Sequence, residues 1–259
     1  MVYRTKKGFF MSTFIHFSNS KNRYPIHADL HTHSVSSGHG STDTVTDMIK
    51  FASDSGLSIL GISEHGPATI GSAKASYFQS LKLADRNRFG IKVLYGAELN
   101  IINTAGDVDL DDSILSTLDY AIISIHPPIL TPYAYKDLTQ AYINAMDHPN
   151  VRFLGHIDDA RFPVDFDYLL EIARKKGVYP EINNNSLMPD AYRVNGQENC
   201  RKILKTCKNL DLPVLLSSDS HGKKEIGNMQ YIFPLLNELD FPSDLVLNSD
   251  LSALSRILQ

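Results

Sequence analysis

The feature that most constrains the fold is a regular alternation of short apolar segments with longer amphipathic ones, which begins near residue 24. The short segments are rich in Ile, Val, Leu and Tyr and are flanked by turn residues, as β-strands are. They predict strands over 26–31, 57–63, 92–98, 119–125, 151–155, 178–183 and 212–217. The longer segments carry apolar residues at helical spacing. They predict helices over 45–52, 73–88, 136–147, 166–176, 197–209, 224–238 and 250–258.

Strands that alternate with helices form parallel sheets, because each helix returns the chain to the starting edge of the sheet. The seven strand–helix units therefore predict an α/β fold, a closed or nearly closed barrel. A chain of 259 residues is long enough for one such barrel. The sequence shows no internal repeat and no interdomain linker, so we predict a single barrel domain over 24–259, preceded by a loose N-terminal extension over 1–23.

The composition argues against several classes of partner. The formal net charge is −4, and the sequence has no basic segment of the kind that binds nucleic-acid backbones. No apolar run reaches the length of a membrane span. The two cysteines, Cys200 and Cys207, share the apolar face of a predicted helix, so we expect both in the core without a disulfide. This usage predicts a reducing, cytoplasmic location.

Seven of the ten histidines fall where one rim of the barrel is expected. In such barrels, functional side chains collect at the carboxyl ends of the strands. Glu98 ends the third predicted strand and Asp219 follows the seventh, so two carboxylates join the same rim. The seven histidines are His31, His33, His39, His65, His126, His156 and His221.

The spacing of these residues indicates shared metal ions. His31 and His33 are separated by one residue, so the alternation along a strand points both imidazoles to the same side. Asp219 and His221 have the same spacing, and Glu98 could bridge two cations through its two oxygens. Nine ligands exceed the needs of one tetrahedral ion, so we predict two or three divalent metal ions. Imidazole-rich sets suit zinc, and manganese or iron would also fit.

The segments around these residues resemble the signature of the PHP family, the polymerase and histidinol phosphatase superfamily. The resemblance extends from about residue 25 to 257 and is nearest to the stand-alone, YcdX-type phosphatases. The segments are HADLHTHSVSSGH (27–39), GISEHG (61–66), GAELNI (96–101), ISIHPP (123–128), GHIDDAR (155–161), PEINNNS (180–186) and SSDSHG (217–222).

This resemblance implies a distorted seven-stranded (βα) barrel, similar to a TIM barrel, with a trinuclear site usually described with zinc. It implies a first metal held by His31, His33, Glu98 and Asp219. It implies a second metal held by Glu98, His126 and His156. It implies a third metal held by His39, His65 and His221.

Two further residues are candidates for catalytic roles. Glu64 stands where the family usually has Asp before the histidine of the second segment. We expect Glu64 to orient an imidazole without binding a metal itself. Arg161 follows His156 by five residues, in the loop beyond the fifth strand, where a guanidinium could clamp phosphate oxygens. An ion pair at the surface is the alternative role for Arg161.

We therefore predict a hydrolase that cleaves small phosphomonoesters with a metal-bound hydroxide at a trinuclear site. A phosphodiesterase or exonuclease of the PHP type and a non-catalytic metal-binding module are the alternatives. An amidohydrolase is disfavoured, because that family bridges its metals with a carboxylated lysine, whereas His126 ends the fourth strand here and Glu98 supplies a bridge. The substrate stays open among histidinol phosphate, nucleotide monophosphates, sugar phosphates and phosphodiesters, and so does a homo-oligomeric state.

Overall fold

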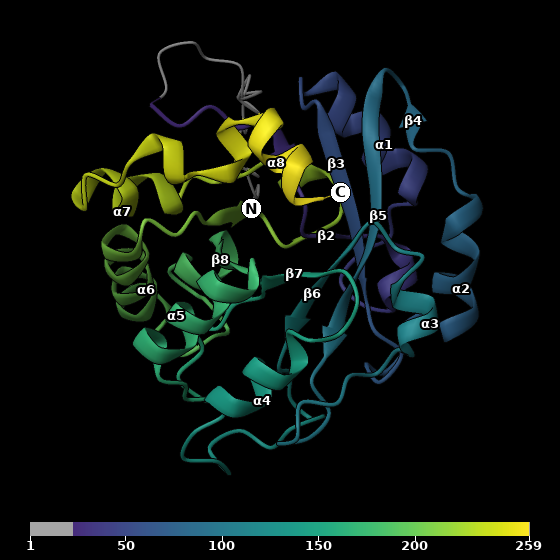
Figure 1. Ribbon diagram of the computed structural model, residues 1–259. Coiled ribbons are helices and arrows are strands. Elements are labelled where there is room, and N and C mark those ends of the chain that lie inside the picture. The colour runs from purple at the N-terminus through teal and green to yellow at the C-terminus, as the bar shows by residue number, and fades with distance from the viewer. Residues whose placement is uncertain (1–22, 259) are drawn as a thin grey trace, which may run out of the picture.

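A computed structural model describes residues 23–258 of the protein as a nearly closed barrel of parallel strands with helices around it (Figure 1). All seven predicted strands are present, and the predicted fold class is confirmed. The predicted extension over 1–23 lies outside the described residues, except for Arg23. The barrel strands, in spatial order, are β1 (Ala28–Asp29), β3 (Ile59–His65), β5 (Ile91–Asn100), β6 (Tyr120–Ser124), β7 (Val151–Leu154), β8 (Tyr179–Asn183) and β9 (Leu215–Ser217).

Helices follow most strands and pack against the outside of the barrel. In Figure 1, α1, α2 and α3 lie on one side of the barrel and α4, α5 and α6 on the other. The helices are α1 (Val45–Asp54), α2 (Ala75–Ser80), α3 (Asp112–Leu115), α4 (Thr139–Ala145), α5 (Phe166–Lys176), α6 (Gly196–Leu210), α7 (Ile232–Glu238) and α8 (Leu251–Ile257).

Two of the predicted helices are too long, and α3 was not predicted. The helix expected over 73–88 ends early, because β4 (Asn87–Arg88) pairs antiparallel with the start of β5. Phe89 and Gly90 form the connecting turn with φ of 50° and 80°, which a helix does not allow. The helix expected over 224–238 begins only at Ile232. The preceding loop is held to the barrel by a hydrogen bond from the Gly227 amide to Asp29 Oδ2 (2.8 Å).

The apolar side chains form two buried clusters, one inside the barrel and one between the barrel and the helices. Successive residues of β6 alternate between them, since Tyr120 belongs to the inner cluster and Ala121 to the outer one. The hydroxyl of Tyr120 crosses the barrel and donates to the carbonyl of Leu30 (2.5 Å). Gly61 and Gly96 leave the space for this ring, because a Cβ atom at either would lie within 3 Å of it.

The barrel closes through a side chain where β1 and β9 meet. These are the first and last strands of the hydrogen-bonded sheet, and the buried side-chain amide of Asn248 lies between them. Its Nδ2 donates to the carbonyls of Ala28 and Leu216, each at 2.8 Å, and its Oδ1 accepts from the amide of Leu216 at 2.8 Å. Asn248 thus supplies hydrogen bonds that a neighbouring strand would otherwise make.

At the carboxyl rim, a second small sheet joins the segment after β1 to the segment after β9. The strand β2 (Thr32–His33) pairs in parallel with β10 (Ser220–His221), and His33 lies opposite His221. This pairing places the first and last predicted metal-binding segments side by side, although they are far apart in the sequence.

The structure confirms that both cysteines are buried and free, on α6. Within residues 23–258, no helix combines the length and the hydropathy needed to cross a membrane. The cytoplasmic location stays a prediction.

Candidate metal centre

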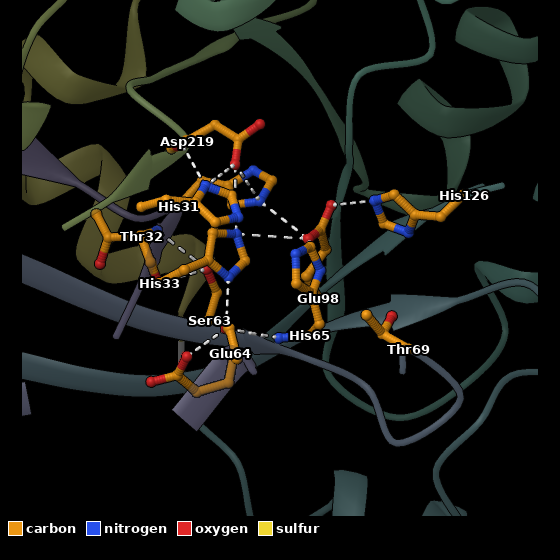
Figure 2. A network of polar contacts seen from close by, with 12 residues as sticks. His31, Thr32, His33, Ser63, Glu64, His65, Thr69, Glu98, His126 and Asp219 are labelled. Atoms are coloured by element: carbon orange, nitrogen blue, oxygen red, sulfur yellow. Dashed lines mark hydrogen bonds and ion pairs between the residues drawn. The ribbon is translucent and has the colours of Figure 1, made fainter. Parts of the chain in front are cut away.

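The predicted ligands lie together at the carboxyl rim, because the parallel strands all end there. The register of β3 with β5 places His65 opposite Glu98, and β2 with β10 places His33 opposite His221. His126 follows β6 and His156 follows β7. Figure 2 shows the imidazoles of His31 and His33 between Asp219 and Glu98, with His126 on the far side of Glu98.

Glu98 lies at the centre of the cluster and is 1% exposed. Its two carboxylate oxygens face five imidazoles from four different segments. Oε2 lies 3.3 Å from His31 Nε2, 3.5 Å from His33 Nε2 and 2.6 Å from His65 Nδ1, and Oε1 lies 3.2 Å from His126 Nε2 and 2.8 Å from His156 Nε2. A carboxylate in this position could contact more than one cation.

Asp219 faces two of these imidazoles, those of His31 and His33. Its Oδ1 lies 3.6 Å from His31 Nε2 and 3.3 Å from His33 Nε2. Its Oδ2 accepts hydrogen bonds from Asn183 Nδ2 (3.0 Å) and Arg193 Nη2 (2.8 Å). One oxygen is therefore directed to the imidazoles and the other is held by protein donors.

The two remaining histidines, His39 and His221, form the outer part of the cluster beside His65. The ring centroid of His39 lies 4.9 Å from that of His65 and 5.0 Å from that of His221, and the rings of His65 and His221 are 5.6 Å apart. The structure thus brings all nine predicted ligand residues into one group.

Several nitrogen and oxygen atoms of this group are buried and make no hydrogen bond to the described residues, although some lie close to one another, as His65 Nδ1 and Glu98 Oε2 do. They are Nε2 of His31, His33, His65 and His221, Nδ1 of His65 and Oε2 of Glu98. Buried polar atoms without partners are costly, so their concentration here points to a ligand that they bind. Three sets could each hold an ion, with donor atoms within 4.8 Å of one another: His31, His33 and Glu98; His65, Glu98 and His126; and His33, His65 and His221.

Four imidazoles are anchored by the ring nitrogen that faces away from the cluster. His31 Nδ1 pairs with Glu181 Oε1 at 2.5 Å, and His126 Nδ1 pairs with the amide oxygen of Asn100 at 2.8 Å. The other two contacts are His33 Nδ1 with Ser37 Oγ (2.9 Å) and His221 Nδ1 with the Asp219 carbonyl (3.1 Å). Such outer contacts orient imidazoles that bind metals.

Glu64 reaches an imidazole only through Ser37. Its buried carboxylate accepts hydrogen bonds from the hydroxyls of Ser34 and Ser37, and the amide of Ser34 donates to Oε2 at 3.1 Å. In Figure 2 the carboxylate points away from Glu98. Burial raises the pKa of Glu64, and the hydrogen bonds from Ser34 and Ser37 oppose this rise.

The buried charges of the site stabilise one another. Burial lowers the pKa of His31, but the carboxylates of Glu181, Glu98 and Asp219 outweigh it and raise this pKa well above its usual value. Burial disfavours the charged form of Glu98, yet the surrounding imidazoles hold its pKa well below the usual range. These carboxylates therefore favour a positive charge on His31, whereas burial holds the pKa of His33 well below its usual value.

Two of the nine residues have backbone conformations that are unfavourable for residues other than glycine. His156 has a φ of 30° and Asp219 a φ of 50°. Residues in such conformations cost roughly 1–3 kcal/mol each and cluster at functional sites. Before His156, Gly155 is required, because a Cβ atom there would lie 2.1 Å from Ser124 Oγ.

A cavity of about 420 Å³ opens over the cluster. Of the described residues, Arg193 lines this cavity, whereas Arg161 does not. The guanidinium of Arg161 pairs with Asp159 (2.5 Å), so an ion pair is its observed contact, but its side chain is only 10% exposed. It also lies over the ring of Tyr192, 4.2 Å from the centroid.

Sequence reasoning missed Glu181 and Arg193. Glu181 lies on β8, near its carboxyl end, so its place at a strand end was a usable signal. Arg193 lies in the loop between β8 and α6, where no periodicity indicates the direction of a side chain.

Comparison with known proteins agrees with this geometry. A protein named a probable phosphatase from Clostridium acetobutylicum is 40% identical over 222 residues, which cover 86% of this chain and 90% of that protein. Among solved structures, a candidate histidinol phosphatase from Listeria monocytogenes has a TM-score of 0.56 at 18% identity and covers 78% of this chain and 97% of its own.

A second solved structure is histidinol phosphate phosphatase from Lactococcus lactis, in complex with zinc, L-histidinol and phosphate. Its TM-score is 0.53 at 16% identity, and the match covers 84% of this chain and 93% of that chain. These two likenesses concern the fold. The family model described as the PHP domain matches residues 29–185, which is more than half of the chain. With the seven-stranded barrel and the histidine-rich rim, this match shows that the protein belongs to the PHP family.

Proposed function

We propose that this protein is a metal-dependent phosphatase that hydrolyses small phosphomonoesters. The observation that carries the proposal is the group of nine imidazole and carboxylate side chains under one cavity, with donor atoms that lack partners among the described residues. The relatives named probable phosphatases and the zinc and phosphate complex of the Lactococcus protein support it.

We assign the ligands to three divalent ions, with zinc as the first candidate and manganese or iron as the alternatives. His31, His33, Glu98 and Asp219 would hold the first ion. Glu98, His126 and His156 would hold the second. His39, His65 and His221 would hold the third. Bound ions of this kind supply Lewis-acid activation of the phosphoryl group and of water.

The protein itself contributes positioning and charge. Arg193 lines the cavity and uses Nη1 and Nη2 to contact Ser186 and Asp219, so other guanidinium donors can bind phosphoryl oxygens. Its positive charge would favour the growing negative charge on the phosphoryl group. Arg161 would act on the same cavity through Tyr192, whose ring it contacts. Glu64 would act as a positioning residue through Ser37.

The experiment that tests the proposal combines metal analysis with hydrolysis. Elemental analysis of untreated protein is expected to find about three transition-metal ions per chain, one for each of the three proposed ligand sets. The protein should hydrolyse 4-nitrophenyl phosphate, and a chelator should abolish this activity. Bis(4-nitrophenyl) phosphate serves as the matched diester.

Each possible result of these measurements favours or contradicts one of the alternative functions. Faster cleavage of the diester would favour a phosphodiesterase. Full metal content without hydrolysis of either ester, or of a panel of phosphorylated metabolites, would favour a non-catalytic module. Less than one metal ion per chain would contradict the metal assignment.

A further inference from the structure

We propose that the cavity selects phosphomonoesters whose alcohol part is uncharged and apolar or aromatic, and that Ile70 and Tyr192 set this preference. The inference rests on the proposed function, because the phosphoryl group would lie over the histidine cluster. It concerns the part of the cavity that the rest of the substrate would contact.

The wall of the cavity differs sharply in chemistry from its floor. The floor consists of the histidines, Asp219 and Arg193. The wall has two polar residues, Thr69 and Asn185, and neither is charged. Its other residues are apolar or aromatic: Ile70, Pro127, Pro128, Ile129 and Tyr192. The wall residues come from three loops: the loop after β3, the loop after β6 and the loop between β8 and α6.

A charged alcohol part would find no suitable partner in this wall. Among the described residues that line the cavity, Asp219 is the only carboxylate, and it already faces two imidazoles and Arg193. The nearby carboxylate of Asp159 is paired with Arg161. A substrate ammonium group would therefore lose hydration without gaining an ion pair, which is unfavourable. An apolar group has no such cost.

The two outermost wall residues are exposed in a way that favours an apolar ligand. Ile70 is 81% exposed and Tyr192 is 73% exposed, although both are large apolar or aromatic residues at a cavity. Covering them with an apolar group removes apolar surface from water. The ring of Tyr192 contacts the guanidinium of Arg161, which Asp159 holds in turn, so little side-chain freedom would be lost on binding.

Binding to the metal-loaded protein tests the inference directly. Calorimetric titration would compare 3-phenylpropylphosphonate with 3-aminopropylphosphonate, which share the phosphonate and the spacer. We expect the phenyl compound to bind at least tenfold more tightly. In the double variant Ile70→Ser/Tyr192→Ser this preference should fall at least fivefold, because the phenyl compound loses its apolar contacts. The matched control Leu83→Ser/Tyr133→Ser changes two equally exposed residues outside the cavity lining and should keep the preference.

Turnover gives the second readout. The ratio of kcat/KM for 3-phenylpropyl phosphate to that for 3-aminopropyl phosphate should also exceed ten, since the two leaving alcohols have similar basicity. Equal affinity and equal turnover of the two compounds, or a preference that survives the double variant, would overturn the inference and leave the phosphatase proposal standing. A failure to bind either phosphonate and to cleave any phosphate ester would overturn both.

Discussion

The hydroxyl of Ser37 lies between Glu64 and His33 and would set which nitrogen of His33 carries a proton. A carboxylate only accepts hydrogen bonds, so the contact of Ser37 with Glu64 uses the single hydroxyl proton of Ser37. Ser37 must then accept from His33 Nδ1, which leaves Nε2 of His33 unprotonated toward Glu98 and Asp219. The contact through this hydroxyl gives Glu64 a route to its predicted role, the positioning of an imidazole.

Replacing Glu64 by Gln is expected to weaken metal binding without unfolding the protein. The Gln amide can donate a hydrogen bond to Ser37. The Ser37 proton is then free to point at His33 Nδ1, which permits the tautomer of His33 that carries its proton on Nε2. Zinc affinity should fall by about 10–100-fold, the usual effect of losing an outer hydrogen-bond partner. Competition with a zinc chelator measures it, and ¹⁵N chemical shifts report the tautomer of His33. If both the zinc affinity and the tautomer of His33 stay unchanged, Glu64 does not act on His33 through Ser37.

Glu98 should affect two metals, whereas His39 should affect one. Glu98→Gln keeps the shape but removes the negative charge that faces five imidazoles. We expect it to lower the metal content at two positions and reduce activity by several orders of magnitude. His39→Ala should lower only the third metal, since its ring contacts His65 and His221.

Elemental analysis and turnover of both variants make this comparison, with circular dichroism as the folding control. If Glu98→Gln keeps its full metal content and near-normal turnover, the bridging assignment is wrong.

At the scale of elements, two contacts close the barrel where its first and last strands meet. The pairing of β2 with β10 holds the carboxyl rim together, and Asn248 joins β1 to β9 below it. Because the rim carries the ligands, the geometry of this closure also sets the distance between His33 and Asp219. One buried side chain between two strands is therefore expected to influence both stability and the site.

The variant Asn248→Ala removes three hydrogen bonds and leaves the buried groups of Ala28 and Leu216 without these partners. We expect the free energy of unfolding to fall by about 2–4 kcal/mol, because unsatisfied buried groups add their desolvation cost to the lost bonds. Urea denaturation measures this loss. The exposed Asn237→Ala on α7 is the control and should change it by less than about 0.5 kcal/mol. If both variants change the free energy of unfolding equally, the hydrogen bonds of Asn248 between β1 and β9 do not stabilise the barrel.

At the scale of the whole molecule, the barrel has an apolar framework that does not depend on the rim. The inner cluster extends from Leu94 and Phe153 to Leu254 of α8. Near the amino ends of the strands, Arg152 donates to the carbonyl of Ile257 at 2.9 Å and holds α8 in place. The histidine cluster lies at the other end of the strands. Folding and metal binding are therefore separable to a large degree.

Removal of the metals should leave the protein folded but less stable. After treatment with a chelator, the far-UV circular dichroism spectrum is expected to stay unchanged while Tm falls by at least about 5 °C, since ligands that bind only the folded state stabilise it. Added zinc should restore the original Tm. Loss of secondary structure on chelation would show that the apolar framework is insufficient.

The sequence by itself determined the barrel, the rim and the family. Period-2 and period-3.6 patterns of apolar residues identify strands and helices, and parallel strands necessarily end at one rim. These two rules are enough to place His65, His126 and His156 together, because each of them ends a predicted strand. The segment patterns from HADLHTHS to SSDSHG were sufficient to identify the PHP family.

Only the tertiary structure decided which side chains contact the cavity and which support it. Arg193, and not Arg161, lines the cavity, and Glu181 and Ser37 are partners of imidazoles in the predicted ligand group. The sequence also did not predict the pairing of β2 with β10, which brings His33 beside His221. The physical reason is that the pattern of a strand sets the direction of its side chains, whereas loop conformation and contacts between distant segments depend on packing across the whole barrel.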